Sequence, residues 1–171
     1  MPGSGVGDYR DDCIRLWHSD GSMAADFRYV GYEILAGSYR IPGLPALHDS
    51  EEEQGQTLVI TLKEVASQVM VCLYYGVFEA ENVITRAVRV ENQGKEDVIL
   101  DECLSCCLDF QFGDLDMVTF AGRHAMERGP ERNPVGRTRL EVGSVRGTSS
   151  HQYNPAVILC SPPATEDFGD L

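Results

Sequence analysis

Val77–Gly94 reads VFEAENVITRAVRVENQG, and the fold class is read most directly from this segment. Its second half, residues 82–91, alternates between two sets of side chains with the two-residue period of a β-strand. Two glutamates, Glu79 and Glu81, interrupt the β-branched residues on either side. Two such runs joined by a short polar segment predict an antiparallel β-hairpin with the glutamates at its tip.

Similar segments flank this hairpin on both sides. TLVITLK (Thr57–Lys63) and QVMVCLYYGVF (Gln68–Phe78) precede it and are separated by a short polar break. The turn NQGK follows it and leads into DVILDECLSCCLDFQF. Strands joined by such short turns predict an antiparallel meander.

More distant segments extend the β pattern. Phe27–Ile41 predicts two short strands broken at Ala36-Gly37, and MVTFAG, RTRLEVGSV and AVILCS predict three more. No window holds the i, i+3, i+4 apolar pattern of a helix. The sequence therefore predicts an all-β protein, built as an antiparallel β-sandwich or a barrel. A loop is expected at the acidic residues 51–53.

Composition limits the function. The 171 residues carry a net charge of −13 and are 43% hydrophobic, which suits one globular domain with a hydrophobic core. The negative charge argues against binding nucleic acid or an anionic membrane surface. A neutral ligand such as a sugar, or another protein surface, fits better. Without a secretory signal or a 20-residue apolar run, we expect a cytoplasmic protein, unless its true N-terminus is missing.

The six cysteines and four histidines do not predict a metal site or a cofactor. CLSCC contains a C-x-x-C spacing, but in a strand Cys103 and Cys106 would point to opposite faces. We expect free, mostly buried thiols. The histidines form no zinc-binding pair, and no G-x-S-x-G elbow is present. The four histidines are His18, His48, His124 and His151.

The two glutamates of the opening stretch have a spacing that resembles a glycosidase pair. Carboxylates at i and i+2 of a strand lie roughly 6–7 Å apart on one face, close to the separation of catalytic pairs. Such a pair must enclose a glycosidic bond in a cleft, whereas a hairpin tip faces water. We therefore expect no catalytic residue here. Trp17 is the one tryptophan and a candidate for stacking on a sugar, although packing is its ordinary role.

The stretch VFEAENVITRAVRVENQG also resembles the N-terminal β-sandwich domain of bacterial α-galactosidases, glycoside hydrolase family 36. Other segments agree in the same order, with Gln56, His124 and Ala156 at positions where the family commonly has Glu, Trp and Phe. These segments are GVGDYR, YEILAG with GLPAL, QTLVITL, FAGRHAMERGPER, GTSSHQYNPAVIL and TEDFGD.

The resemblance implies an incomplete supersandwich-type β-sandwich over residues 6–171. In that family, two aspartates of a (β/α)₈ barrel hydrolyse terminal α-galactosides such as raffinose and melibiose with retention. The barrel is absent from this chain, so no catalytic residue can be assigned, and the fragment alone is expected to be inactive. The implied partners are galactosides bound by the full-length enzyme, the enzyme's own barrel, and neighbouring subunits of a homo-oligomer.

Several polar residues are candidates for the contacts of such a domain. Charged cross-strand pairs among Glu79, Arg86 and Arg89 can fix the hairpin register. Alternatively, Glu79 or Arg86 meets a neighbouring domain or subunit. His151 and Asn154 lie in SSHQYNP, which is either a polar loop that bonds its own backbone or a contact surface. His151 is also a candidate for substrate contact.

Two other functions stay open at this point. A free-standing carbohydrate-binding module would need exposed aromatics on one sheet face, and Trp17, Tyr29, Tyr32 and Tyr39 show no clear platform by spacing. A scaffold that only mediates oligomers is the third reading. If the chain is a fragment that lacks neighbouring strands, its uncovered apolar edges predict marginal solubility, self-association, or strand pairing with another copy.

Overall fold

A computed structural model describes residues 3–5, 7, 10–45, 54–110, 113–165 and 167. The chain divides into two compact units, Met1–Leu108 and Asp109–Leu171, where length alone predicts one domain. The described residues contain nine strands and no helix. The predicted loop at 51–53 and His48 lie outside the described residues.

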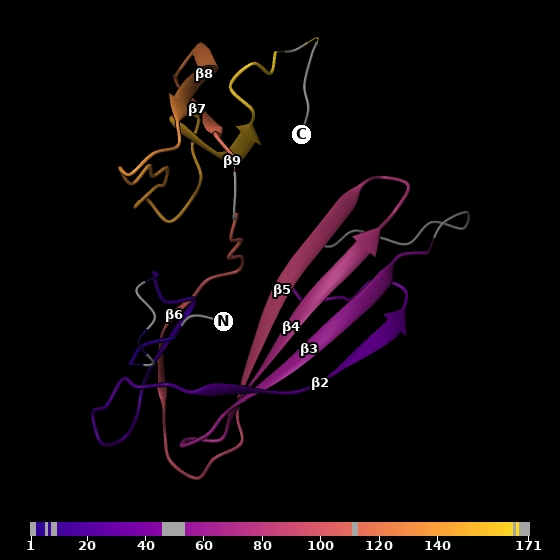
Figure 1. Ribbon diagram of the computed structural model, residues 1–171, viewed down its shortest axis with the longest axis vertical. Helices are drawn as coiled ribbons and strands as arrows, with labels where there is room; N and C mark the ends of the chain where they lie inside the picture. The colour runs from indigo at the N-terminus through magenta and orange to yellow at the C-terminus, as the bar shows by residue number, and fades with distance from the viewer. Residues whose placement is uncertain are drawn as a thin grey trace. The chain divides into compact units, whose positions relative to one another are not determined.

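The first unit holds a four-stranded and a two-stranded antiparallel sheet (Figure 1). The larger sheet has the order β2-β3-β4-β5 and confirms the predicted hairpins. The smaller sheet pairs β1 with β6. The strands are β1 (Ile14–Trp17), β2 (Phe27–Ala36), β3 (Gln56–Glu64), β4 (Val69–Phe78), β5 (Val83–Asn92) and β6 (Ile99–Cys103).

The prediction of two short strands in 27–41 is wrong, because β2 is one strand of ten residues that ends before Gly37. Gly37 has φ 84°, a left-handed conformation that glycine adopts without steric cost. Its N–H donates to the Gly55 carbonyl at 2.8 Å, and its own carbonyl accepts from Thr57 Oγ1 at 2.8 Å. These bonds close the end of the β2–β3 ladder, and no strand follows in 38–45.

The predicted meander continues through β5 but not into β6. The turn after β5 is closed by Asn92, whose Oδ1 accepts from the Gly94 amide and whose Nδ2 donates to the Glu96 carbonyl. β6 then leaves the larger sheet and pairs with β1, with Ile14 opposite Cys103. The assumption that every short turn returns to the same sheet is therefore wrong at this turn.

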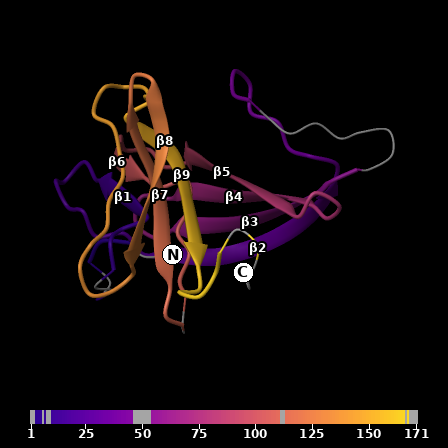
Figure 2. The ribbon, with the colours of Figure 1, turned by 90° about the horizontal axis from the view of Figure 1, so that it is seen from above.

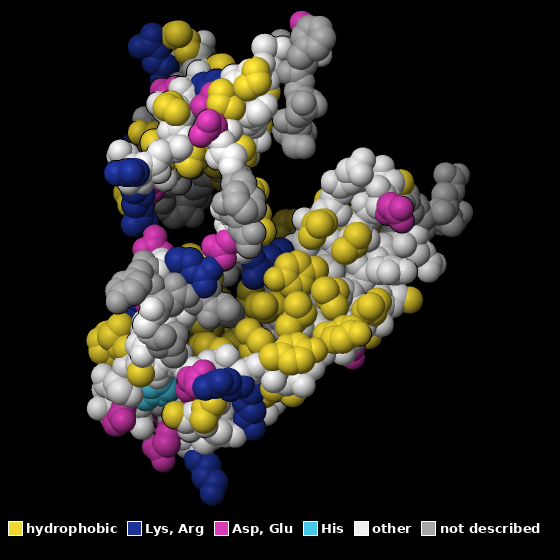
Figure 3. All heavy atoms as spheres, in the orientation of Figure 1, with side chains coloured by type: hydrophobic (Ala, Val, Ile, Leu, Met, Phe, Trp, Pro, Cys, Tyr) yellow, Lys and Arg dark blue, Asp and Glu magenta, His cyan; other side chains and the backbone are white. Residues whose placement is uncertain are grey.

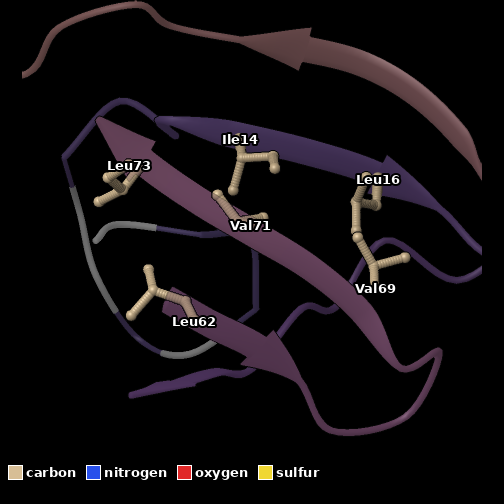
Figure 4. Packing of buried hydrophobic residues seen from close by; sticks show 6 residues of the cluster. All are labelled: Ile14, Leu16, Leu62, Val69, Val71 and Leu73. Carbon is tan, nitrogen blue, oxygen red and sulfur yellow. The ribbon is translucent and has the colours of Figure 1, made fainter. Parts of the chain in front are cut away.

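The core lies between β1 and one end of the larger sheet (Figure 4). Ile14 and Leu16, on alternate positions of β1, are fully buried against side chains of β3 and β4. Burying a large aliphatic side chain contributes about 1.5–3 kcal/mol. The cluster is Ile14, Leu16, Leu62, Val69, Val71 and Leu73.

The second unit is a three-stranded antiparallel sheet of order β8-β7-β9 (Figure 2). Its strands are β7 (Asp116–Arg123), β8 (Met126–Pro134) and β9 (Tyr153–Cys160). β7 and β9 confirm the predictions from MVTFAG and AVILCS. The strand predicted at RTRLEVGSV is wrong, because 138–149 is irregular. β8 instead contains Gly129 and Pro130, which an edge strand tolerates because its outer side needs no ladder bonds.

Arg132 ties the strands of this unit to the segment after β9. Its Nε donates to Asp116 Oδ2 at 2.6 Å, and its remaining nitrogens donate to the carbonyls of Ser161, Pro162 and Ala164 at 2.7–2.9 Å. One guanidinium thus satisfies four acceptors on two segments. The planar fork of arginine suits this task, which lysine cannot reproduce.

Candidate functional site

The two glutamates of the opening stretch lie where the sequence predicts, at the tip of the β4–β5 hairpin. Glu79 and Glu81 are both exposed, and the Asn82 amide closes the turn by donating to the Glu79 carbonyl at 3.2 Å. Glycosidase acids enclose a bond in a cleft and depend on one pKa raised by burial. An exposed turn supplies neither condition, so this pair is not a catalytic site.

The predicted charged cross-strand pairs are wrong. Arg86 lies opposite Tyr75, and its guanidinium carbon stands 5.0 Å from the centre of that ring, a cation–π contact. Arg89 pairs with Glu91 on its own strand. Among the described residues, neither arginine forms an ion pair with Glu79. The hairpin register is therefore set by apolar and aromatic neighbours.

Arg86 carries an uncompensated polar atom. Its Nε is buried and has no hydrogen-bond partner, the one such side-chain atom found among the described residues. Buried donors without an acceptor are rare in native proteins, because each costs about 1–3 kcal/mol. Arg86 is therefore the residue of this unit whose environment most calls for a ligand or a partner.

A cavity of about 820 Å³ lies along β5 and includes Arg86. Residues of both parities of β5 line it, so the cavity follows the free edge of this outermost strand. The loop after β2 and the end of β6 supply the other walls, which are mainly apolar. The lining is Ser38, Tyr39, Ile41, Leu44, Pro45, Phe78, Thr85, Arg86, Ala87, Val88, Val90, Leu100, Cys103 and Ser105.

One face of the larger sheet bears a set of exposed apolar side chains (Figure 3). They lie on the same face as the core cluster, because their register partners on β3 are separated from the cluster residue Leu62 by even numbers of residues. Val77 is likewise four residues from Leu73 on β4, and Ile84 is paired with Val77. Tyr32, Ile34 and Ile84 are 63–69% exposed. We call this surface the open apolar face; its members are Tyr29, Tyr32, Ile34, Val77 and Ile84.

A β-bulge in β2 determines which of its side chains lie on the open apolar face. In a regular strand, Tyr29 and Tyr32 would point to opposite sides, because they are three residues apart. Val30 has no partner on β3, and the register passes from Tyr29 opposite Leu62 to Tyr32 opposite Ile60. The extra residue therefore brings the two tyrosines onto one face. Sequence spacing missed this pair, and a bulge leaves no spacing signal of its own.

The cysteines are free, as predicted, but they are not mostly buried. Cys13 and Cys160 are buried, while Cys106 is exposed and the other three are intermediate. Burial, with a contribution from nearby Cys107, raises the pKa of Cys13 to about 11, and burial also raises the pKa of Cys103. Such thiols stay protonated at neutral pH, and the thiol is neither nucleophile nor metal ligand. The prediction that Cys103 and Cys106 lie in one strand is wrong, because β6 ends at Cys103.

The remaining candidates do not form one site. Trp17 ends β1, is 39% exposed, and lines neither of the cavities found among the described residues. His151 is exposed in the turn before β9, where Ser150 bonds the local backbone as predicted. Asn154 lines a second cavity of about 400 Å³ formed by 142–155. Trp17 and His151 belong to different units.

Catalytic and metal-binding groups are not assembled within the described ranges. Glu64 is their one buried carboxylate, and its oxygens accept bonds from Ser67 and the Asp26 amide. Among these residues, no three His, Cys, Asp or Glu are grouped to hold a metal. No helix there is long and apolar enough to cross a membrane.

Comparison with known proteins gives consistent matches along the whole chain. The family described as Glycosyl hydrolase family 36 N-terminal domain matches residues 1–171. The bifunctional alpha-galactosidase/sucrose kinase AgaSK of Mediterraneibacter gnavus is 46% identical over 168 residues, which is 98% of this chain and 18% of that protein. Alpha-galactosidase 1 of Pediococcus pentosaceus is 39% identical over 98% of this chain and 23% of its own length.

Solved structures agree with the sequence matches. A variant of the alpha-galactosidase AgaA from Geobacillus stearothermophilus, in complex with raffinose, matches with a TM-score of 0.91 and 37% identity. The match covers 96% of this chain and 23% of that one. The chain thus spans about a fifth of the length of the relatives it matches.

Proposed function

Because the chain belongs to glycosyl hydrolase family 36 as its N-terminal domain, we propose that it serves as the non-catalytic N-terminal domain of an α-galactosidase. The observation that carries this proposal is a contrast between the carboxylates and two groups that lack partners in the described part of the chain, the open apolar face and Arg86 Nε. The carboxylates of the described residues are exposed or saturated, whereas an apolar sheet face and a buried arginine donor lack partners. Such a unit is suited to packing and not to chemistry.

The substrates of the whole enzyme are terminal α-galactosides of the raffinose and melibiose type. The supporting observation is that a matching structure holds raffinose. Hydrolysis with retention, by two aspartates of a (β/α)₈ barrel, is the mechanism implied by the family resemblance. This chain contributes to the shape of the active-site surround and to the packing of the neighbouring domain.

Assembly is the second half of the proposal. The domain packs on the enzyme's own barrel and on neighbouring subunits of a cytoplasmic homo-oligomer. Glu79, Arg86, His151 and Asn154 are the proposed contact residues. Arg86 has the strongest structural support of the four, because its buried Nε has no acceptor among the described residues.

The isolated 171-residue chain gives the first test. It should release no chromophore from a nitrophenyl α-galactoside, and its circular dichroism should be that of a folded β protein. Turnover by the pure, folded chain would contradict the assignment of catalysis to another part of the enzyme.

A carbohydrate-binding module is the second candidate, and one observation favours it. The bulge at Val30 places Tyr29 and Tyr32 side by side on one face, each more than 60% exposed, and exposed aromatic rings stack on sugars. Titration calorimetry of the chain with galactose, melibiose and raffinose tests this function. Saturable heat that is lost in a Tyr32→Ala variant would favour the module over the packing domain.

A further inference from the structure

The open apolar face continues the hydrophobic core. Tyr32, opposite Ile60, and Ile34, opposite Leu58, follow on β2 from Tyr29, which is paired with the core residue Leu62. β1 covers this face only at the core end (Figure 4). The same layer of side chains is thus packed by protein at the core end, while farther along it Tyr32, Ile34 and Ile84 are 63–69% exposed.

Arg86 adds to this surface a positive charge and a hydrogen-bond donor that has no acceptor within the described ranges. It lies on the same face, since its register partner Tyr75 packs against the core cluster and the guanidinium stands over that ring. Val77 and Ile84, the next register pair, are exposed beside it. The Tyr75 ring contacts the flat face of the guanidinium. It cannot accept a hydrogen bond from Nε–H, which points within the guanidinium plane. A carboxylate can, and it accepts from arginine with strong, short bonds.

We infer that the open apolar face, together with Arg86, is a docking surface for an apolar protein segment that carries one Asp or Glu. The apolar side chains of that segment cover Tyr32, Ile34 and Ile84, and its carboxylate enters the cavity beside β5 to bond Arg86 Nε. The inference rests on the proposed function, which places this domain in a larger assembly. It adds the surface used, the anchor residue and the chemistry of the partner.

A sugar fits this surface less well than a protein segment. Sugar sites combine an aromatic ring with several polar groups that bond the hydroxyls. Here the two tyrosines are continued by Ile34, Val77 and Ile84, which offer no hydrogen bond. A small carboxylate could bond Arg86, yet it would leave the rest of the face in water. The extent of the apolar surface therefore favours a macromolecular partner.

The test uses a chimera in which this chain replaces the matching 168-residue segment of the Mediterraneibacter gnavus α-galactosidase. Hydroxyl-radical footprinting measures the oxidation rates of Tyr29 and Tyr32 in the native chimera and in the urea-unfolded chimera. The inference predicts rates several-fold lower in the native state. Unprotected tyrosines in an active chimera would overturn the docking surface and leave the proposed function standing.

Two further outcomes separate the competing explanations. Protection of Tyr32 that requires added raffinose would overturn the inference in favour of a sugar site. Protection without raffinose in a chimera that hydrolyses nothing would support the docking surface and count against the proposed function. The two ideas therefore fail independently.

The anchor is tested by Arg86→Met, with Arg89→Met as the matched control on the same strand. In the chimera, Arg86→Met should lower the melting temperature and Arg89→Met should leave it nearly unchanged. In the isolated chain, Arg86→Met should lower it by less, because only the contact with the Tyr75 ring is lost there. Arg86→Lys should recover only part of the melting temperature lost in Arg86→Met, since lysine keeps the positive charge but has no guanidinium Nε–H. Equal effects of Arg86→Met in chimera and isolated chain would overturn the role of the carboxylate.

Discussion

Glu64 offers the sharpest test of the first unit, because a carboxylate that is 1% exposed closes the β3–β4 turn. It accepts from the Ser67 amide, from Ser67 Oγ at 2.6 Å and from the Asp26 amide at 3.2 Å. Burial raises the pKa of Glu64, but the bonds from Ser67 and the backbone amides outweigh burial and lower the pKa below its ordinary value of 4.5. The ion is therefore the form that the fold selects.

Glu64→Gln keeps the shape of the side chain and removes its charge. The amide retains one acceptor oxygen and turns a donor toward the other amide or hydroxyl group. Losing one charge-assisted bond of this kind costs about 1.5–3 kcal/mol. For a chain of this size, that loss corresponds to about 3–12 °C in melting temperature at pH 7.

The pH dependence has a definite sign. Because the folded pKa lies below the unfolded value of 4.5, the carboxylate contributes its full stability above pH 4.5. That contribution is lost as the pH falls through the folded pKa. The difference in melting temperature between the parent and Glu64→Gln should therefore be largest at neutral pH and should shrink below pH 4.5.

Circular dichroism melts from pH 3 to pH 7 measure both effects. Glu81→Gln is the matched control, because Glu81 is exposed at a hairpin tip, and it should melt like the parent throughout. If Glu64→Gln matched the parent at pH 7, or if the difference stayed constant down to pH 3, the buried-carboxylate reasoning would be refuted.

Three further substitutions test other parts of the fold. Leu16→Ala removes a fully buried side chain from the core and should cost about 2–5 kcal/mol by urea unfolding; a loss below 1 kcal/mol would contradict the core assignment. Gly94→Ala places a Cβ against the backbone carbonyl of Ser67 and should cost about 1–3 kcal/mol, and an unchanged urea midpoint would argue against that close turn. Arg132→Lys can keep the ion pair with Asp116 but not all the carbonyl bonds, so limited proteolysis within 161–167 should become faster, and an unchanged cleavage rate would count against the clamp.

Local pattern was sufficient for three consecutive strands of the larger sheet. β3, β4 and β5 have alternating or continuous β-branched residues and short turns, and their bounds agree with the prediction to within about a residue or two. Such strands are predictable because each pairs with its neighbour in the chain. β6 was harder, because its partner β1 is 82 residues earlier, counted from Trp17 to Ile99.

The edge strand β8 and the irregular features could not be predicted from pattern. β8 contains Gly129 and Pro130 and is exposed at every position, so it has no hydrophobic alternation to recognise. The bulge at Val30 changes which side chains share a face, but it leaves no mark in the pattern of residue types. Both features depend on the partner strand, which a single-sequence reading does not see.

The candidate site, too, was predictable in some features and not in others. Spacing correctly placed Glu79 and Glu81 at a hairpin tip, and family resemblance correctly identified the domain. Neither could show that Arg86 stacks on Tyr75 and leaves Nε without an acceptor. That property depends on the cross-strand register and on the uncovered face, which only the folded chain defines.

The activity of the chimera is the most direct test of the central claim, that this chain is a non-catalytic N-terminal domain that an α-galactosidase needs for its structure. Hydrolysis of raffinose would be compared between the chimera and the Mediterraneibacter gnavus enzyme from which the matching 168-residue segment is deleted. We predict that the truncated enzyme is inactive or insoluble and that joining this chain restores turnover. A truncated enzyme as active and stable as the chimera would contradict the claim.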